Sequence, residues 1–83
     1  MPRASVNAGL LLSAEELNAL LARKKLRQKD AAWMVGKSER IVRGWCIGEY
    51  DVPQYAAVIL RAYDLGALTA RMLRAIIGRD PPA

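Results

Sequence analysis

The sequence predicts an all-α protein of five short helices in one compact domain. Apolar residues recur at helical spacing in five segments, whereas no segment shows the alternation typical of a strand. Capping residues, glycine or proline bound these segments. The length of 83 residues suffices for one domain and leaves no room for a second. The expected domain spans residues 13–78, between a flexible N-terminal arm, residues 1–12, and a short tail, residues 79–83.

The first helix begins at a capping box. The Ser13 hydroxyl can accept from the Glu16 N–H, and the Glu16 carboxylate can accept from the Ser13 N–H. Leu12 and Leu17 stand at the two positions of a hydrophobic staple. One face of the helix is expected to bury three leucines, namely Leu17, Leu20 and Leu21. The last turn carries three cations, Arg23 to Lys25, which suit the negative end of the helix dipole.

The next two helices are expected at residues 28–35 and 39–46, joined by a tight turn. Gly36 can adopt the left-handed conformation that ends the first of them. Ser38 caps the second, which places Val42 and Trp45, three residues apart, on its inward face. The opposite face of this helix is therefore expected to be exposed.

The last two helices are expected from about 53 to 66 and from about 67 to 77. Pro53 fits the first turn of the former, where its missing N–H has no cost. The latter carries more apolar residues than one small core can cover from the end of a chain. We expect these residues to form a homodimer interface: Leu68, Met72, Leu73, Ile76 and Ile77. Leu68 and Met72 are also suited to completing the monomer core.

Positive charge gathers in residues 23–43. This window holds eight basic side chains and two acidic ones, a net charge of +6, whereas the whole chain carries +5. Clustered Lys and Arg side chains bind polyanions because they release counterions from phosphates. The window therefore favours a nucleic-acid partner, with a solvated helical surface as the alternative.

The composition excludes several kinds of chemistry. The chain has no histidine and one cysteine, Cys46, so His-based catalysis, Cys/His zinc sites and an intramolecular disulfide are excluded. We find no catalytic set and expect no enzyme activity, metal, cofactor or small-molecule ligand. The longest apolar run is Leu10 to Leu12, and no signal peptide is evident, so we expect a cytoplasmic protein without membrane contact.

Residues 26–48, LRQKDAAWMVGKSERIVRGWCIG, resemble the helix-turn-helix of the lambda repressor and Cro-like (XRE) family. The match rests on seven residues at the family's spacing: Gln28, Ala32, Gly36, Ser38, Val42, Trp45 and Gly48. This resemblance implies a lambda-repressor-like DNA-binding domain with a C-terminal dimerisation helix. It also implies a transcriptional repressor that binds an inverted repeat in double-stranded DNA as a homodimer.

The resemblance further implies which residues contact DNA. Ser38, Glu39, Arg40 and Gly44 would face bases, and Arg43 would lie close to bases or backbone. Arg40 suits guanine and Glu39 suits cytosine, although Glu39 and Arg43 are also spaced for a surface ion pair. The family places Gln28 on a phosphate, and the residues that flank it are expected to do the same: Arg27, Lys29 and Lys37. Tyr50 and Tyr55, near the start of the fourth helix, are also suited to donate to phosphates, although Tyr55 is equally suited to the core.

Two residues depart from the family pattern. Trp33 and Ile41 stand where smaller or polar residues are usual, so we expect both to be partly exposed, packed on each other or on the arm. An alternative function follows from this surface or the last helix, namely an antitoxin-like module that binds a partner protein.

Within the family, the runs 38–40, 42–43 and 80–82 are similar to anti-CRISPR-associated regulators of phages and mobile elements, which repress their own operon.

Overall fold

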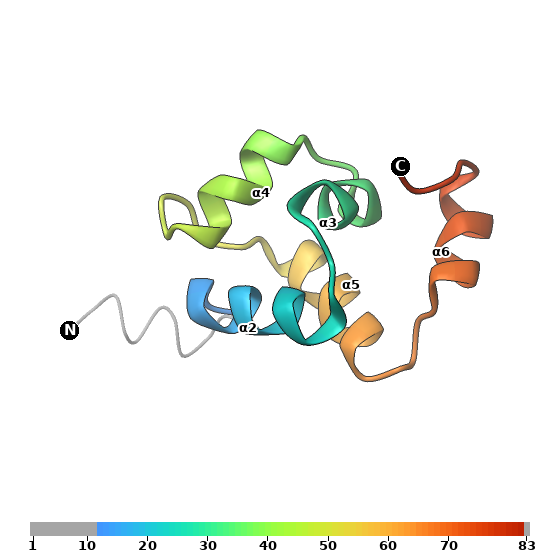
Figure 1. The fold of residues 1–83 in the computed structure, drawn as a ribbon, viewed down its shortest axis with the longest axis horizontal. Coiled ribbons are helices and arrows are strands. Elements are labelled where there is room, and N and C mark those ends of the chain that lie inside the picture. Colours follow the sequence, from blue (N-terminus) through green and yellow to red (C-terminus); the bar gives the residue numbers. More distant parts are fainter. Residues whose placement is uncertain (1–11, 83) are drawn as a thin grey trace.

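Five α-helices and no strand make up the part of the chain that the computed structural model describes, residues 12–82. The all-α class predicted from the sequence is therefore confirmed. The first 11 residues of the predicted arm, and Ala83, lie outside the described residues. The helices, labelled as in Figure 1, are α2 (Ala14–Lys24), α3 (Gln28–Val35), α4 (Glu39–Cys46), α5 (Gln54–Asp64) and α6 (Ala70–Ile77).

Side-chain caps set where three of the helices begin. The predicted capping box of α2 is present, with the Glu16 N–H donating to Ser13 Oγ over 3.1 Å and the Ser13 N–H donating to Glu16 Oε1 over 2.8 Å. Ser38 caps α4. Thr69 caps α6, so this helix begins at Ala70, three residues later than predicted.

Two other predicted boundaries change slightly. Pro53 was expected inside the first turn of its helix but is the N-cap residue of α5, in an extended conformation. Leu12 was assigned to the flexible arm but is fully buried. It belongs to the core because its side chain packs with the leucines of α2.

The core is aliphatic apart from two indole rings and the sulfur-containing side chains of Met34 and Cys46. Its largest fully buried side chains come from the segment before α2 and from three helices: Leu12, Leu17, Leu20, Val42 and Leu60. Alanines of α3 and α5 are buried as well, which lets helix backbones approach closely. Among residues 12–82 no polar or charged side chain is buried. Burial of apolar surface is therefore the main stabilising term.

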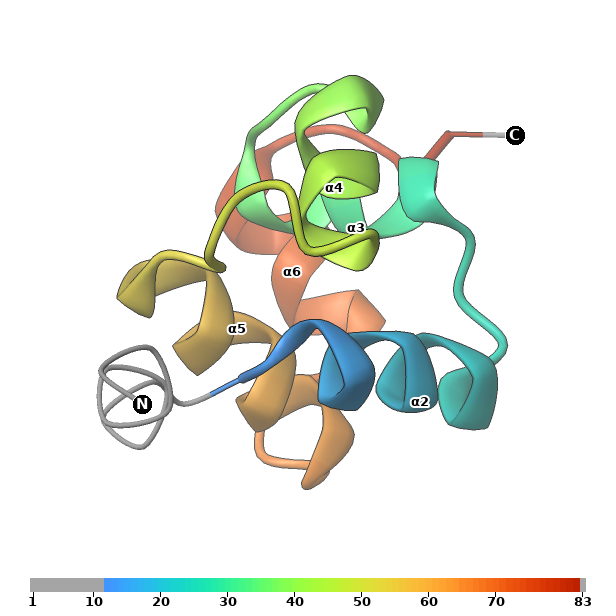
Figure 2. The same cartoon turned by 90° about the vertical axis from the view of Figure 1, so that its left-hand side faces the viewer.

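α2 to α5 pack around this core, with α3 against both α4 and α5 and with α2 against α4 (Figures 1 and 2). Two surface ion pairs join α2 to α5. Arg23 pairs with Asp64 over 2.7 Å, and Arg61 pairs with Glu16 over 3.3 Å. In Figure 1, α6 lies at the right-hand end of the molecule, beyond α3 and α5. None of the helices between residues 12 and 82 is long and apolar enough to cross a membrane.

Replacing Trp45 with alanine should lower the free energy of unfolding by about 3–5 kcal/mol, because it empties an aromatic site in the core. The Trp45 side chain is only 3% exposed. Urea-induced unfolding followed by circular dichroism measures the change. Ile47→Ala, two residues further along and 68% exposed, is the matched control and should change little. Equal midpoints for the two variants would show that Trp45 does not support the fold.

Candidate nucleic-acid interface

A three-residue turn, Gly36 to Ser38, joins α3 to α4. Gly36 has a φ of +75°, a left-handed conformation that a side chain would strain, and its N–H donates to the Ala32 carbonyl over 2.9 Å. The Ser38 hydroxyl accepts from the Ile41 N–H over 3.3 Å and so begins α4 at once. The turn thereby brings α4 directly against α3, as the sequence predicted for these residues.

The two faces of α4 differ in the way the sequence predicts. Val42 and Trp45 are buried in the core, whereas Arg40 and Arg43 are exposed. An α-helix turns by about 100° per residue, so Arg40 lies nearly opposite the inward face that Val42 and Trp45 define. α4 therefore presents a basic outer surface on a rigidly packed helix.

A hydrogen bond that sequence analysis missed holds the far end of α4. Asn18, on α2, donates through Nδ2 to the Cys46 carbonyl over 2.8 Å. The last carbonyls of a helix lack partners within the helix, so this amide satisfies one of them. The two residues are 28 positions apart, and no local pattern in the sequence indicates that they meet.

The predicted base-contacting residues lie along the exposed side of the turn and α4. Ser38, Glu39, Arg40 and Arg43 are all exposed. The surface ion pair considered above for Glu39 and Arg43 does not form. Neither Arg40 nor Arg43 pairs with a carboxylate within residues 12–82. Both guanidinium groups are therefore available to an external anion.

Gly44 requires a correction. The sequence placed it on the base-contacting surface, but the structure buries it, because the ring of Tyr50 folds back over its α-carbon. Gly44 is thus covered by its own chain and does not face solvent. Tyr50, which the sequence assigned to a phosphate, is half exposed above it.

The predicted phosphate contacts differ in their surroundings. Lys37 is exposed, with its Nζ 6.0 Å from the centroid of the Tyr55 ring, and Lys29 is half-buried. Neither lysine forms an ion pair with a carboxylate among the described residues. The side chain of Gln28 is half-buried and within hydrogen-bonding reach of the Cys46 thiol. Lys37, two residues before α4, therefore adds to its basic surface, whereas Lys29 lies in the first turn of α3.

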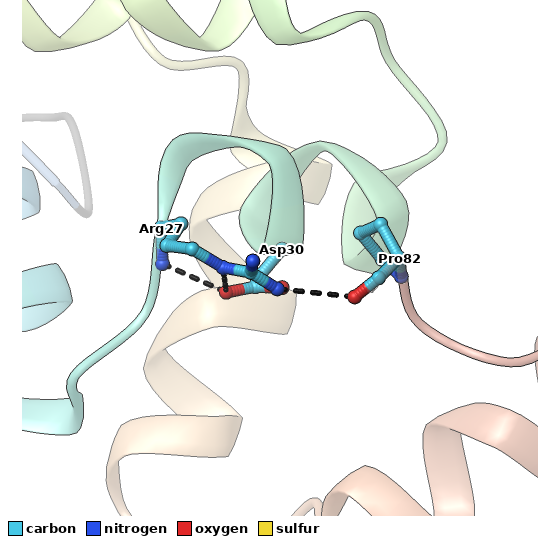
Figure 3. Close-up of polar contacts among 3 residues, drawn as sticks. All are labelled: Arg27, Asp30 and Pro82. Atoms are coloured by element: carbon cyan, nitrogen blue, oxygen red, sulfur yellow. Dashed lines mark hydrogen bonds and ion pairs between the residues drawn. The ribbon is translucent and has the colours of Figure 1, made fainter.

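The guanidinium of Arg27, for which a phosphate contact stays a prediction, is engaged within the molecule (Figure 3). Nε and Nη2 donate to the two carboxylate oxygens of Asp30 over 2.9 and 2.8 Å, and Nη2 also donates to the Pro82 carbonyl over 3.0 Å. The Arg27 N–H donates to Asp30 Oδ2 over 2.8 Å. Arg27 is therefore the N-cap residue of α3, its N–H is bound by the Asp30 carboxylate, and its guanidinium holds residue 82.

Trp33 and the C-terminal tail also differ from what the sequence predicts. Trp33 was expected to be partly exposed, but it is buried, and its Nε1 donates to the Arg79 carbonyl over 3.2 Å. Ile41 is half-buried against the core. The C-terminal segment contacts α3 and the residue before it through Arg79 and Pro82, and its Pro81 lines a mostly apolar groove of about 220 Å³. The other lining residues are Leu26, Asp30, Trp33, Met34, Tyr63, Ala70 and Leu73.

The apolar residues of α6 divide into two groups. Leu73 is only 3% exposed and belongs to the monomer core, so its assignment to a dimer interface is corrected. Leu68 and Ile77 are half-buried against the same core. Met72 and Ile76 point outward, with 49% and 74% of their surface exposed. The outer face of α6 is therefore apolar at these two positions.

Cys46 is a buried thiol at the end of α4. Burial raises the pKa of Cys46 because it disfavours the thiolate, and the Gln28 side chain opposes this effect in part. Within residues 12–82 no cluster of cysteine, aspartate and glutamate could hold a metal ion.

No protein-family model, no curated protein and no solved structure matches this chain. Its function must therefore be inferred from its own residues and their geometry.

The bonds between Arg27 and Asp30 predict a pH dependence. Hydrogen bonds from the Arg27 side chain, and then from its backbone N–H, hold the pKa of Asp30 below its ordinary value, against the opposing effect of partial burial. A lowered carboxyl pKa stabilises the folded protein above the ordinary pKa, and this stabilisation is lost as the pH falls through the lowered value. Wild type should therefore be more stable than Asp30→Asn at neutral pH, and the difference should shrink in acid.

Urea unfolding at neutral and acidic pH measures this difference. Glu15→Gln is the control, because Glu15 lies in the first turn of α2 without an ion pair or side-chain hydrogen bond to residues 12–82. Its difference from wild type should be small at both pH values. A difference for Asp30→Asn that stays constant down to acidic pH would show that the interaction with Arg27 is not lost on protonation.

Proposed function

We propose that this chain is a sequence-specific repressor that binds double-stranded DNA as a homodimer, in the manner of the XRE family. In this proposal α4 enters the major groove, which is wide enough for an α-helix, and Arg40 forms paired hydrogen bonds with guanine. Such a cytoplasmic protein would occupy an inverted repeat in the promoter of its own operon and so exclude RNA polymerase.

The observation that carries the proposal is the difference between paired and unpaired arginines. Arg23 and Arg27 are each bound to an aspartate, whereas Arg40 and Arg43 have no carboxylate partner among the described residues. The unpaired arginines lie on the exposed face of one packed helix, and Lys37 precedes its first residue by two positions. A surface that keeps several cations unneutralised on a rigid helix suits a polyanion that fits along the helix.

The outer face of α6 supports the homodimeric form. Met72 and Ile76 lie one helical turn apart and are exposed. Pairing of this face with the same face of a second copy would remove both side chains from water. Two copies would present two α4 helices to successive major grooves, about 34 Å apart.

The alternative, an antitoxin-like module, has less support in the structure. It relied partly on an exposed surface formed by Trp33 and Ile41, and Trp33 is buried beneath the chain's own residues 79–82. The outer face of α6, with Met72 and Ile76 exposed, remains as a surface to which such a partner protein could bind.

Arg40→Ala should abolish the preference for an operator sequence while leaving the fold intact. The loss of one paired contact with guanine corresponds to about 1–3 kcal/mol of discrimination. Fragments bound by wild type, selected from random duplex DNA, supply the probe, and mobility shifts over a range of salt concentrations measure affinity. Wild-type affinity should fall steeply with salt, because each neutralised phosphate adds about 0.9 to the slope of log affinity against log salt.

Arg71→Ala is the matched control, because Arg71 is an exposed arginine on α6, away from α4. It should bind the selected DNA as wild type does. An equal loss in both variants would place the DNA near α6 and contradict the assignment of α4. Failure of wild type to bind any duplex, together with copurification of a partner protein, would favour the alternative function.

Ile76→Glu should convert the dimer to a monomer, because it places a charge in the apolar contact between two copies. Light scattering after size-exclusion chromatography measures the mass. Val58→Glu, at an exposed apolar position of α5, is the control and should leave the dimer intact. A dimer that persists in Ile76→Glu would place the interface elsewhere on the surface.

A further inference from the structure

The chain reverses sharply at the end of α4. Gly48 has a φ of +80°, and the N–H groups of Glu49 and Tyr50 both donate to the Gly44 carbonyl, over 2.8 and 3.3 Å. These two bonds satisfy a carbonyl in the last turn of the helix. They also direct residues 49 and 50 back over the helix that the chain has just left.

This reversal lays the Tyr50 ring on Gly44. A Cβ atom built on Gly44 would lie 2.5 Å from both Cδ2 and Cε2 of the ring, closer than real atoms approach. The ring therefore occupies the space that a side chain at position 44 would need. Because Gly44 has no side chain, the contact forms without displacing the backbone of either segment.

Position 44 lies on the outward face of α4. Gly44 follows Arg40 by four residues, so the two positions are neighbours on the same face, opposite Val42. Gly44 is nevertheless buried. The atoms nearest to it are ring carbons of Tyr50, whose own side chain remains half exposed, and then Glu49 Oε1, which would lie 3.5 Å from a Cβ atom at position 44. The surface beside Arg40 is thus supplied by a residue from the following loop.

We infer that Tyr50 contacts a base in the major groove, in the place that the side chain of residue 44 would otherwise occupy. This inference rests on the proposed function and specifies how the same surface distinguishes sequences. Thymine is the base expected, because the major groove displays its methyl group and an apolar ring edge packs against that methyl group. The site would then select thymine next to the base that Arg40 contacts.

Four variants test this inference against duplexes selected by wild type from a random-sequence library. Tyr50→Phe keeps the ring and should keep the thymine preference. Tyr50→Ala removes the ring and should reduce that preference about five- to tenfold, which corresponds to about 1–1.4 kcal/mol. Gly44→Ala should cause a similar loss, because the new methyl group displaces the ring from its position.

The double variant Gly44→Ala with Tyr50→Ala provides the sharpest comparison. Once the ring is absent, the alanine methyl group at position 44 faces the groove itself and should recover part of the thymine preference. Gly44→Ala is therefore expected to weaken selectivity in wild type and to improve it in Tyr50→Ala. Two residues that acted independently would instead show additive effects.

The free proteins show whether each variant keeps its fold and its ring position. Alanine is a better helix former than glycine by about 1 kcal/mol, so Gly44→Ala should remain folded, with an unfolding midpoint near that of wild type. In wild type the Tyr50 ring current should shift the Gly44 Hα resonances in NMR spectra. Tyr50→Ala should remove this shift and Tyr50→Phe should preserve it.

The outcomes separate this inference from the proposed function. If wild type selects no duplex, the proposed function fails. If wild type selects a sequence and Tyr50→Ala selects it equally well, the function stands and the role of Tyr50 is overturned. If Tyr50→Phe loses affinity for all sequences alike, the hydroxyl binds a phosphate and the inference is also overturned. A contact in NMR spectra between Tyr50 ring protons and a thymine methyl group would support it directly.

Discussion

The packing of Val42 and Trp45 in the core is the interaction on which the rest of the structure depends. It fixes the rotation of α4 about its own axis, and this rotation decides which side chains reach solvent. Asn18 and the turn at Gly36 hold the two ends of the same helix. The rigid placement of α4 thus comes from the apolar core, while the chemistry of its outer face is left free to vary.

Aspartates determine which arginines remain available at the surface. The sequence shows eight basic residues between 23 and 43, and their clustering predicts a basic surface. It does not show that Asp64, 41 residues from Arg23, lies beside that arginine, or that the Pro82 carbonyl, 55 residues from Arg27, accepts from its guanidinium. Distant partners of this kind depend on how the helices pack, and a local pattern carries no information about them.

Local signals were sufficient to predict most of the fold. The capping box at Ser13, the glycine turn at Gly36 and the apolar spacing of each segment specified five helices within a few residues, since these features act over one or two turns. The folding of Tyr50 over Gly44 and the burial of Leu73 beside exposed Ile76 could not be predicted. Both depend on where a loop or a helix docks, which is decided by tertiary packing.

The two indole rings of this chain stand in different parts of the structure. Trp45 is enclosed by the core, whereas Trp33 donates to the Arg79 carbonyl beneath the C-terminal segment. Their fluorescence should therefore respond to different events, Trp45 to loss of the core and Trp33 to lifting of residues 79–82. Replacing Trp45 with phenylalanine would leave Trp33 as the single tryptophan, so that detachment of this segment becomes visible without an added dye.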